Sequence, residues 1–194
     1  MSIPSRTEAA AILAALEPNE KLLRHSTAVA EVAAFLCAAM ARRGQAVDAA
    51  AVEAAALLHD VDKMLPADHP LKPMGHAHAG AEWVRSRGYG ELADAIEAHP
   101  VMEIGNAPSY EAWATRAGLV GKIITYADKR ARQDVLSLDE RFAKWQSDYP
   151  NSPKLDLALE RARRLEAEMC ELAGLRADDV QRLPWVTEAI RAAA

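Results

Sequence analysis

Residues 54–63 read Ala54-Ala55-Ala56-Leu57-Leu58-His59-Asp60-Val61-Asp62-Lys63, an apolar run that ends in an adjacent histidine and aspartate. Neighbouring side chains point in different directions from the middle of a helix. At a helix end the backbone can turn, and both side chains can then reach one metal ion. The pair alone is a weak signal because His-Asp dipeptides occur by chance, so its interpretation depends on the rest of the chain.

Further residues with metal-binding side chains lie on or beside apolar helical faces, namely His25, His76, His99 and Asp128. Each of them alone is more often a hydrogen-bonded core residue than a ligand. A buried carboxylate is costly unless it is paired or bound to a metal, and one shared metal would compensate all of these residues at once. Together with His59 and Asp60, the set predicts a metal site.

The composition predicts an all-α protein of one domain. The 194 residues are enough for one hydrophobic core, and 51% of them are hydrophobic. Alternating β-branched runs are nearly absent, which favours helices over strands. The formal net charge of -5 argues against a general nucleic-acid binder, which would carry a basic stripe. A phosphate site in such an acidic protein must be a local basic pocket.

The cysteines and the N-terminal sequence bear on location. The cysteines are Cys37 and Cys170, without a Cys-x-x-Cys motif, which is typical of a reducing compartment and excludes a thiolate zinc site. The N-terminal residues lack a basic segment followed by a long apolar one. No segment approaches the roughly 20 apolar residues needed to cross a bilayer. We therefore expect a cytoplasmic protein without a membrane partner.

Capping residues, apolar periodicity and helix breakers divide the chain into segments. We expect helices over residues 5–17, 19–43, 48–59, 76–88 and 92–99, over 119–127 leading to Asp128, and from about 137 and 154 onward. Residues 61–75, which contain several prolines, and residues 101–109 are expected to form irregular loops. His69 falls in the first loop, and His78 points away from His76 on a helix, so neither is expected in the site.

The order His25, His59-Asp60, His76, His99, Asp128 resembles the HD-domain metal-dependent phosphohydrolases, which are helical bundles around a mono- or binuclear metal site. The resemblance implies a catalytic core over residues 20–135, a helical C-terminal appendage over 136–194 and a single domain over 1–194. It implies that one metal is bound by His25, His59, Asp60 and Asp128. A second metal would be bound by His76 and His99, with Asp60 as the bridging ligand.

The sequence departs from related motifs at two places. HD hydrolases that split diadenosine tetraphosphate carry Glu-Pro-x-Arg shortly after the final aspartate, whereas this chain reads Lys129-Arg130-Ala131-Arg132-Gln133-Asp134. The segment after His59-Asp60 has Asp62 where the common form His-Asp-x-Gly-Lys has glycine, although Lys63 is retained. The metal-site motif is therefore intact, and the substrate stays open.

The ligand types indicate which metals and which chemistry the site would use. Imidazole and carboxylate together suit iron, manganese, cobalt, nickel or zinc, so we expect one or two divalent transition metal ions. Two such ions lower the pKa of a bridging water and hold phosphoryl oxygens. Asp60 would then be catalytic, bridging the ions and holding the hydroxide. Cations for the phosphate are expected from Lys63, also assigned as catalytic, and from Lys129, Arg130 and Arg132.

The leading hypothesis is a metal-dependent phosphohydrolase that acts on a phosphate ester, either a nucleotide or another small phosphorylated metabolite, with a metal-bridging hydroxide. One alternative is an HD-fold di-iron oxygenase. Another is a non-catalytic sensor module that binds a nucleotide. The sequence specifies neither the native metal nor the substrate, and it leaves the oligomeric state open, a homodimer included.

Overall fold

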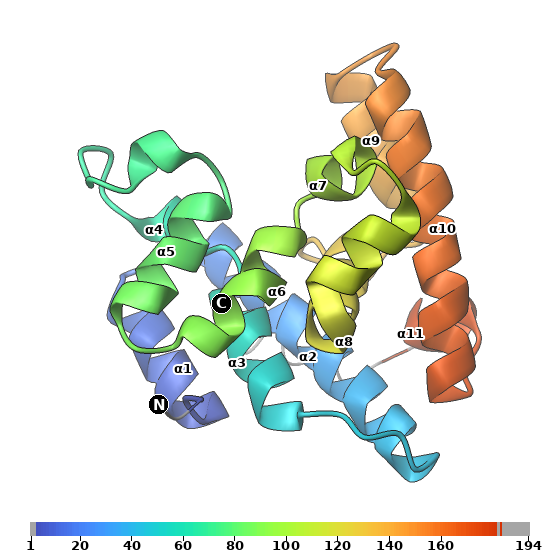
Figure 1. The fold of residues 1–194 in the computed structure, drawn as a ribbon, viewed down its shortest axis with the longest axis horizontal. Coiled ribbons are helices and arrows are strands. Elements are labelled where there is room, and N and C mark those ends of the chain that lie inside the picture. Colours follow the sequence, from blue (N-terminus) through green and yellow to red (C-terminus); the bar gives the residue numbers. More distant parts are fainter. Residues whose placement is uncertain (1–2, 182, 184–194) are drawn as a thin grey trace.

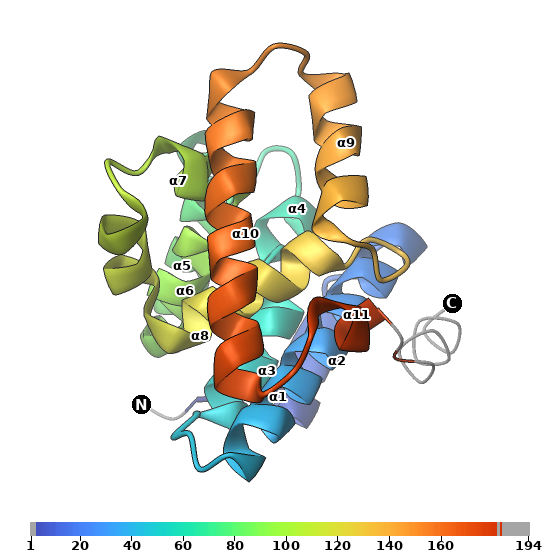
Figure 2. The same cartoon turned by 90° about the vertical axis from the view of Figure 1, so that its right-hand side faces the viewer.

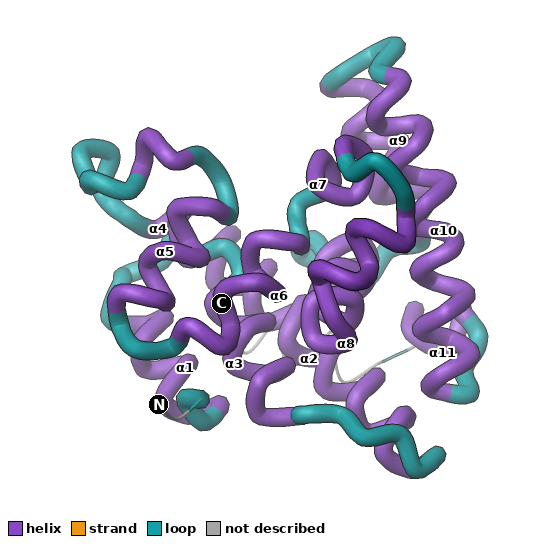
Figure 3. Tube along the Cα trace, in the orientation of Figure 1, coloured by secondary structure: helices purple, strands orange, loops and turns teal. Residues whose placement is uncertain are grey.

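A computed structural model describes residues 3–181 and residue 183, and over these residues the protein is all-α (Figures 1 and 3). The described part of the chain has no β-strand, only an isolated bridge between Ala131 and Val135. The helices are α1 Arg6–Ala14, α2 Glu20–Arg42, α3 Ala49–Leu58, α4 Val61–Met64, α5 His78–Ser86, α6 Ala93–Ala98, α7 Val101–Asn106, α8 Tyr110–Arg130, α9 Leu138–Asp148, α10 Pro153–Ala173 and α11 Ala177–Gln181, with 3-10 turns η1 Lys72–Met74 and η2 Gly90–Leu92.

Capping side chains explain where several helices begin. Ser5, Asn19, Asp48 and Ser137 each accept a hydrogen bond from a backbone N–H in the first turn of the helix that follows. Such a bond satisfies one of the donors that a helix start leaves without a partner inside the helix. The helix starts expected at these residues are confirmed.

Three mutually contacting helices, α2, α3 and α8, form the centre of the structure. Their inward faces are fully buried at positions such as Val29, Leu58 and Ile124. Helix α6 packs on α3 and α8, and α5 packs on α6. Gly121 of α8 permits the close approach of α6, because a Cβ there would lie 3.2 Å from the Cα of Ala95.

Two segments expected as loops contain helices. Residues 61–75 include α4 and η1, and residues 101–109 include α7. The first helix has only four residues, too few to show an apolar period. The second was missed because Pro100 was taken as the end of a helix. Pro100 also precedes the first residue of α7, where a proline costs no hydrogen bond.

Helices α9 and α10 run side by side and extend beyond the other helices at the end where a loop joins them (Figure 2). Helix α10 contacts α2, α7 and α8, and α9 contacts α8. Of the expected C-terminal appendage 136–194, residues 182 and 184–194 lie outside the described residues. The division into a 20–135 core and an appendage stays a prediction.

By length and composition, α2 would be long and apolar enough to cross a membrane, which differs from the expectation that no segment is. Half of the apolar window in α2 is buried inside the protein. The helix contacts α3, α8 and α10 and carries His25 and Ser26 on its buried face. These contacts are those of a core helix in a bundle.

The contact between α7 and α10 depends on a glycine, which gives a stability test. A Cβ on Gly105 would lie 2.6 Å from the backbone oxygen of Lys154 and 3.3 Å from the Cβ of Ala158. Overpacking of this kind costs about 1–3 kcal/mol, more than the gain of up to about 1 kcal/mol from helix propensity. We expect Gly105→Ala to lower the melting temperature in thermal denaturation.

Gly90 is a matched control for this variant. A Cβ on Gly90 would meet only the Cγ of Arg85, at 3.9 Å, which is ordinary contact. Gly90→Ala should therefore leave the melting temperature unchanged or raise it slightly. Equal melting temperatures for both variants and the wild type would contradict the close packing of α7 on α10.

Candidate metal centre

His59 and Asp60 occupy the break between α3 and α4. Helix α3 ends at Leu58, and Asp60 has φ -104° and ψ 18° before α4 begins at Val61. These angles lie in the bridge region, outside the regular helix, so the backbone turns between the two side chains. Both residues are buried, with exposures of 0% and 1%.

Ring hydrogen bonds at helix ends fix His59 and His99. Nδ1 of His59 lies 2.7 Å from the carbonyl oxygen of Ala56, and Nδ1 of His99 lies 2.6 Å from that of Ile96. A carbonyl oxygen only accepts, so each Nδ1 carries the proton and donates it. Each Nε2 therefore keeps its lone pair for the interior of the site.

His25 and His76 are fixed by partners from other segments. Nδ1 of His25 lies 3.3 Å from the carbonyl oxygen of Arg132, and Nδ1 of His76 lies 3.0 Å from Oδ2 of Asp62. Both partners are acceptors, so Nδ1 donates in each ring and Nε2 is the nitrogen that faces the cluster. A hydrogen bond from one ring nitrogen to an acceptor is the usual way in which proteins orient a metal-binding histidine.

His76 lies in the turn before α5 and does not open that helix as expected. Gly75 has φ 82° and Ala77 has φ 65°, a backbone region that an L side chain rarely adopts. This strained turn directs Nε2 of His76 toward Asp60, at 3.6 Å from Oδ1.

The other two histidines lie outside the cluster, in line with the expectation. Nδ1 of His78 lies 3.3 Å from Oε1 of Glu97. Nδ1 of His69 accepts a hydrogen bond from the backbone N–H of Leu71, at 3.2 Å.

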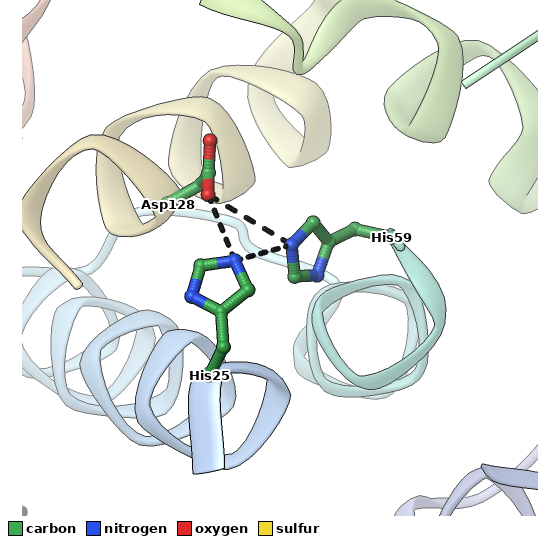
Figure 4. Close-up of side chains that lie close together, drawn as sticks. All are labelled: His25, His59 and Asp128. Atoms are coloured by element: carbon green, nitrogen blue, oxygen red, sulfur yellow. Dashed lines mark hydrogen bonds and ion pairs between the residues drawn. The ribbon is translucent and has the colours of Figure 1, made fainter. Parts of the chain in front are cut away.

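Figure 4 shows the first group of converging side chains, His25, His59 and Asp128, which come from α2, the end of α3 and α8. The two Nε2 atoms are 3.2 Å apart. Oδ1 of Asp128 lies 3.1 Å from Nε2 of His25 and 3.8 Å from Nε2 of His59. The mutual packing of the three central helices thus brings three electron-pair donors to one point.

Asp60 divides the remaining contacts between its two carboxylate oxygens. Oδ2 lies 3.5 Å from Nε2 of both His25 and His59. Oδ1 lies 3.6 Å from Nε2 of both His76 and His99. Oδ1 is buried and has no hydrogen-bond partner among the described residues. The carboxylate therefore connects two sets of imidazoles, one on each oxygen.

Burial and neighbouring charges set the protonation states of the cluster. Burial lowers the pKa of His59 to about 3 and also lowers the pKa of His99, so both rings are neutral near pH 7. Burial raises the pKa of Asp60, but the groups around it, including the ammonium of Lys63, outweigh burial and hold that pKa well below its usual range. Burial likewise opposes ionisation of Asp128, and the ammonium of Lys129 outweighs it, so its pKa is also well below the usual range.

The cluster has the donor set of a metal site. Neutral imidazoles and ionised carboxylates are the forms that bind metals. All converging atoms are electron-pair donors, and the buried Oδ1 of Asp60 has no donor facing it, so shared cations fit among them. Three overlapping groups meet the distance requirement for a metal: His25, His59 and Asp128; His59, Asp60 and His99; and Asp60, Asp62 and His76.

Asp62 is a member of the site that the sequence interpretation missed. Its carboxylate is 6% exposed and accepts the hydrogen bond from Nδ1 of His76. Gly80 of α5 leaves room for it, because a Cβ there would lie 3.2 Å from Oδ1 of Asp62. The available signal was the departure itself, a carboxylate two residues after Asp60 where related motifs have glycine.

A cavity of about 550 Å³ opens beside the cluster and is lined by His25, His76, His99 and Asp128. Lys63 lines this cavity and also a neighbouring one of about 290 Å³, which Arg132 lines as well. The structure thus places these two predicted phosphate-binding residues at the cavities.

The other two predicted substrate-binding residues lie elsewhere, which corrects the expectation. Lys129 is 1% exposed and donates to Oδ2 of Asp128, at 2.5 Å, and to the carbonyl oxygen of His99, at 2.7 Å. Arg130 is also 1% exposed and donates to Tyr126 and Glu166. Both side chains are engaged within the protein, so Lys129 orients Asp128 and Arg130 holds α8 against α10.

Helix α9 and Tyr149, the residue that follows it, contribute further cavity residues that the sequence interpretation did not assign to the site. Arg141, Trp145 and Tyr149 line the larger cavity, and Arg141 and Trp145 also line the smaller one. Their spacing of four residues puts them on one helical face. That spacing was visible in the sequence, but nothing in it indicated that this face turns toward the cluster.

The fold and the buried cluster of histidines and aspartates place the protein among helical proteins with a candidate metal centre. The HD-domain family model matches residues 22–133, more than half of the chain, and the chain belongs to this family. The match includes all six residues predicted as ligands. No curated protein and no solved structure matches the chain.

The hydrogen bond from His76 to Asp62 gives a test of the site that does not depend on turnover. Loss of a carboxylate that orients a metal-binding histidine typically costs about 10- to 100-fold in metal affinity. We expect Asp62→Ala to lower metal affinity by about this factor, measured by titration of chelator-treated protein. Glu97→Ala, which removes the carboxylate beside His78, is the matched control and should bind metal like the wild type. Unchanged affinity in Asp62→Ala would contradict the orienting role.

Proposed function

We propose that the protein is a metal-dependent phosphohydrolase acting on a phosphate ester of a nucleotide or another small metabolite. The observation that carries the proposal is the position of Asp60, with one oxygen toward His25 and His59 and the other toward His76 and His99. A carboxylate in this position suits two ions held side by side. HD-domain proteins are mostly metal-dependent hydrolases, which supports the class.

In this proposal, each imidazole has a defined partner ion. His25, His59, Asp60 and Asp128 would hold the first ion, and His76 and His99 would hold the second together with Asp60. When bound, such ions supply Lewis acidity for the phosphoryl oxygens and lower the pKa of a bound water. The chain's own contribution is to orient the four Nε2 atoms toward the ions through their Nδ1 hydrogen bonds.

Lys63 is placed to bind a phosphoryl oxygen of the substrate. Its Nζ lies 2.8 Å from Oδ2 of Asp60, and its side chain is 43% exposed at the border of both cavities. The ammonium can therefore contact a bound anion while it keeps its hydrogen bond to Asp60. A cation there offsets the negative charge that the carboxylates would present to phosphate.

The larger cavity suits the organic part of the substrate. Apart from the cluster, its walls include the apolar side chains of Val101, Met102, Trp145 and Leu155. A volume of about 550 Å³ is within the range of small-molecule sites. Trp145 and Tyr149 provide aromatic surface for a planar group such as a nucleobase.

The first experiment is a metal analysis of protein purified without chelator, followed by a phosphate-release screen over nucleotides and sugar phosphates. Phosphate release that depends on the bound metal would support the hydrolase. Iron-dependent oxygen consumption without phosphate release would favour the di-iron oxygenase. Nucleotide binding without turnover by metal-loaded protein would favour the sensor module.

Asp60→Asn tests the bridging position. The amide keeps the shape but loses the negative charge shared between the two sets of imidazoles. We expect turnover to fall by about 100-fold or more and the metal content to fall with it. The measurement is the phosphate-release rate together with metals per chain. Near-normal turnover in metal-depleted Asp60→Asn protein would refute the mechanism.

Lys63→Ala separates phosphate binding from metal binding. A hydrogen bond to a charged group contributes about 1.5–3 kcal/mol, so kcat/KM should fall by about 10- to 100-fold while the metal content stays that of the wild type. Lys154→Ala removes an exposed lysine at the start of α10 and serves as the control. Full activity in Lys63→Ala would place this residue among the solvated surface charges.

A further inference from the structure

The smaller cavity is basic, although the protein as a whole is acidic. Its volume is about 290 Å³, and the cations that line it are Lys21, Lys63, Arg132, Arg141 and Lys144. The chain carries a formal net charge of -5, so a local excess of cations needs a specific explanation. His25 and Asp60 also line this cavity, which places it directly against the histidine and aspartate cluster.

Two of these cations have partners and three do not. Lys63 is paired with Asp60, at 2.8 Å, and Lys144 with Asp148, at 2.5 Å. Over residues 3–181, the side chains of Lys21, Arg132 and Arg141 form no ion pair or hydrogen bond. Such residues are usually solvated when they lie far apart, but here they line one concave surface.

Arg141 is the most constrained of the three. Its guanidinium stacks 4.1 Å from the ring centre of Trp145, and its Nε is buried without a hydrogen-bond partner in the described part of the chain. Burial lowers the pKa of Arg141, and the positive charge of Arg132 lowers it further. The carboxylates of Asp128 and Asp60 act in the opposite direction. A buried guanidinium with an unused donor beside another cation is stabilised by an anion that accepts from both.

We propose that the smaller cavity binds a second phosphoryl group of the substrate, with Arg141 and Arg132 as the residues that select for it. This inference rests on the proposed function, because the first phosphoryl group is the one at the cluster. Three unpaired cations match a phosphoryl dianion better than a carboxylate with a single charge. The substrate class is therefore a compound with two phosphoryl groups close together, as in a diphosphate.

The location of the cavities supports this division of the substrate. Both cavities are lined by His25, Lys63, Arg141 and Trp145, so a molecule at the cluster borders both of them. Val101, Met102 and Leu155 line only the larger cavity, whereas Lys21 and Arg132 line only the smaller one and Arg141 borders both. Arg141 lies on α9, outside the residues 22–133 that match the HD-domain family, so this selectivity would belong to the C-terminal part of the chain.

Binding of two simple phosphonates to the full-length, metal-loaded protein tests the inference. Methylphosphonate has one phosphonate group, and methylenediphosphonate has two joined by a carbon that cannot be hydrolysed. Isothermal titration calorimetry should show tighter binding of methylenediphosphonate to the wild type. Arg141→Gln should raise its Kd by about 10-fold or more and change the Kd of methylphosphonate by less than about 2-fold. Arg132→Gln should have the same effect, independently of any local change at α9.

Arg163→Gln is the matched control, since Arg163 lies on α10 in an exposed ion pair with Asp139 and should not affect either ligand. An equal loss for both phosphonates, or no loss for either in Arg141→Gln and Arg132→Gln, would overturn the inference. The readout is binding, so it separates this inference from the hydrolase proposal. If the variants lose affinity for methylenediphosphonate alone and no ester releases phosphate, the hydrolase proposal is wrong and the second phosphoryl site stands. If phosphate is released but the variants show no such selective loss of affinity, the second phosphoryl site is wrong and the hydrolase proposal stands.

Discussion

The carboxylate of Asp60 meets side chains from five segments of the chain, and the packing of the central helices converges on it. His25 comes from α2, His59 from the end of α3 and His99 from the end of α6, while Lys63 lies on α4 and His76 in the turn before α5. An ionised carboxylate that is 1% exposed is strongly destabilising unless such groups surround it. His59 and His99 follow the last residues of α3 and α6, and each imidazole bonds to a carbonyl three residues earlier, so these helix ends orient both rings.

Much of this arrangement could be predicted from the sequence, because it depends on local rules. Apolar spacing of three and four placed His25 on the inward face of α2 and Asp128 on that of α8, and capping residues located the starts of α1, α2, α3 and α9. The helix α7 could not be found in this way, since Pro100 is compatible with both the end of one helix and the start of the next. The start of α5 was misplaced because the positive φ of Ala77 is imposed by the surrounding structure and has no signal in an alanine.

In the site, too, local sequence patterns did not reveal contacts that depend on tertiary packing. The residues around His59 and Asp60 could be assigned from residue type and order, but the partner of each Nδ1 could not, since Arg132 and Asp62 meet the histidines only through tertiary packing. Lys129 and Arg130 illustrate the opposite error. Their positions next to Asp128 suggested contact with substrate, yet both are buried, Lys129 beside the cluster and Arg130 against α10. Sequence proximity to a site does not determine on which side of a helix a cation lies.

Under the proposed function, the distribution of charge determines whether the metal or the anionic substrate binds first at the cluster. The ionised carboxylates of Asp60 and Asp128 lie beside the neutral imidazoles of His59 and His99, and this part of the cluster repels a phosphoryl group at short range. Cations held at the cluster reverse this sign, whereas the basic cavity carries its positive charge in the side chains of the protein. Under the proposed function, an anion would therefore be attracted to the cavity with or without metal, but would occupy the cluster only after the metal is bound. Arg141 and Trp145 lie on α9, outside the family-matched residues 22–133, so under the proposed function part of the surface that contacts substrate would come from the chain beyond the matched region.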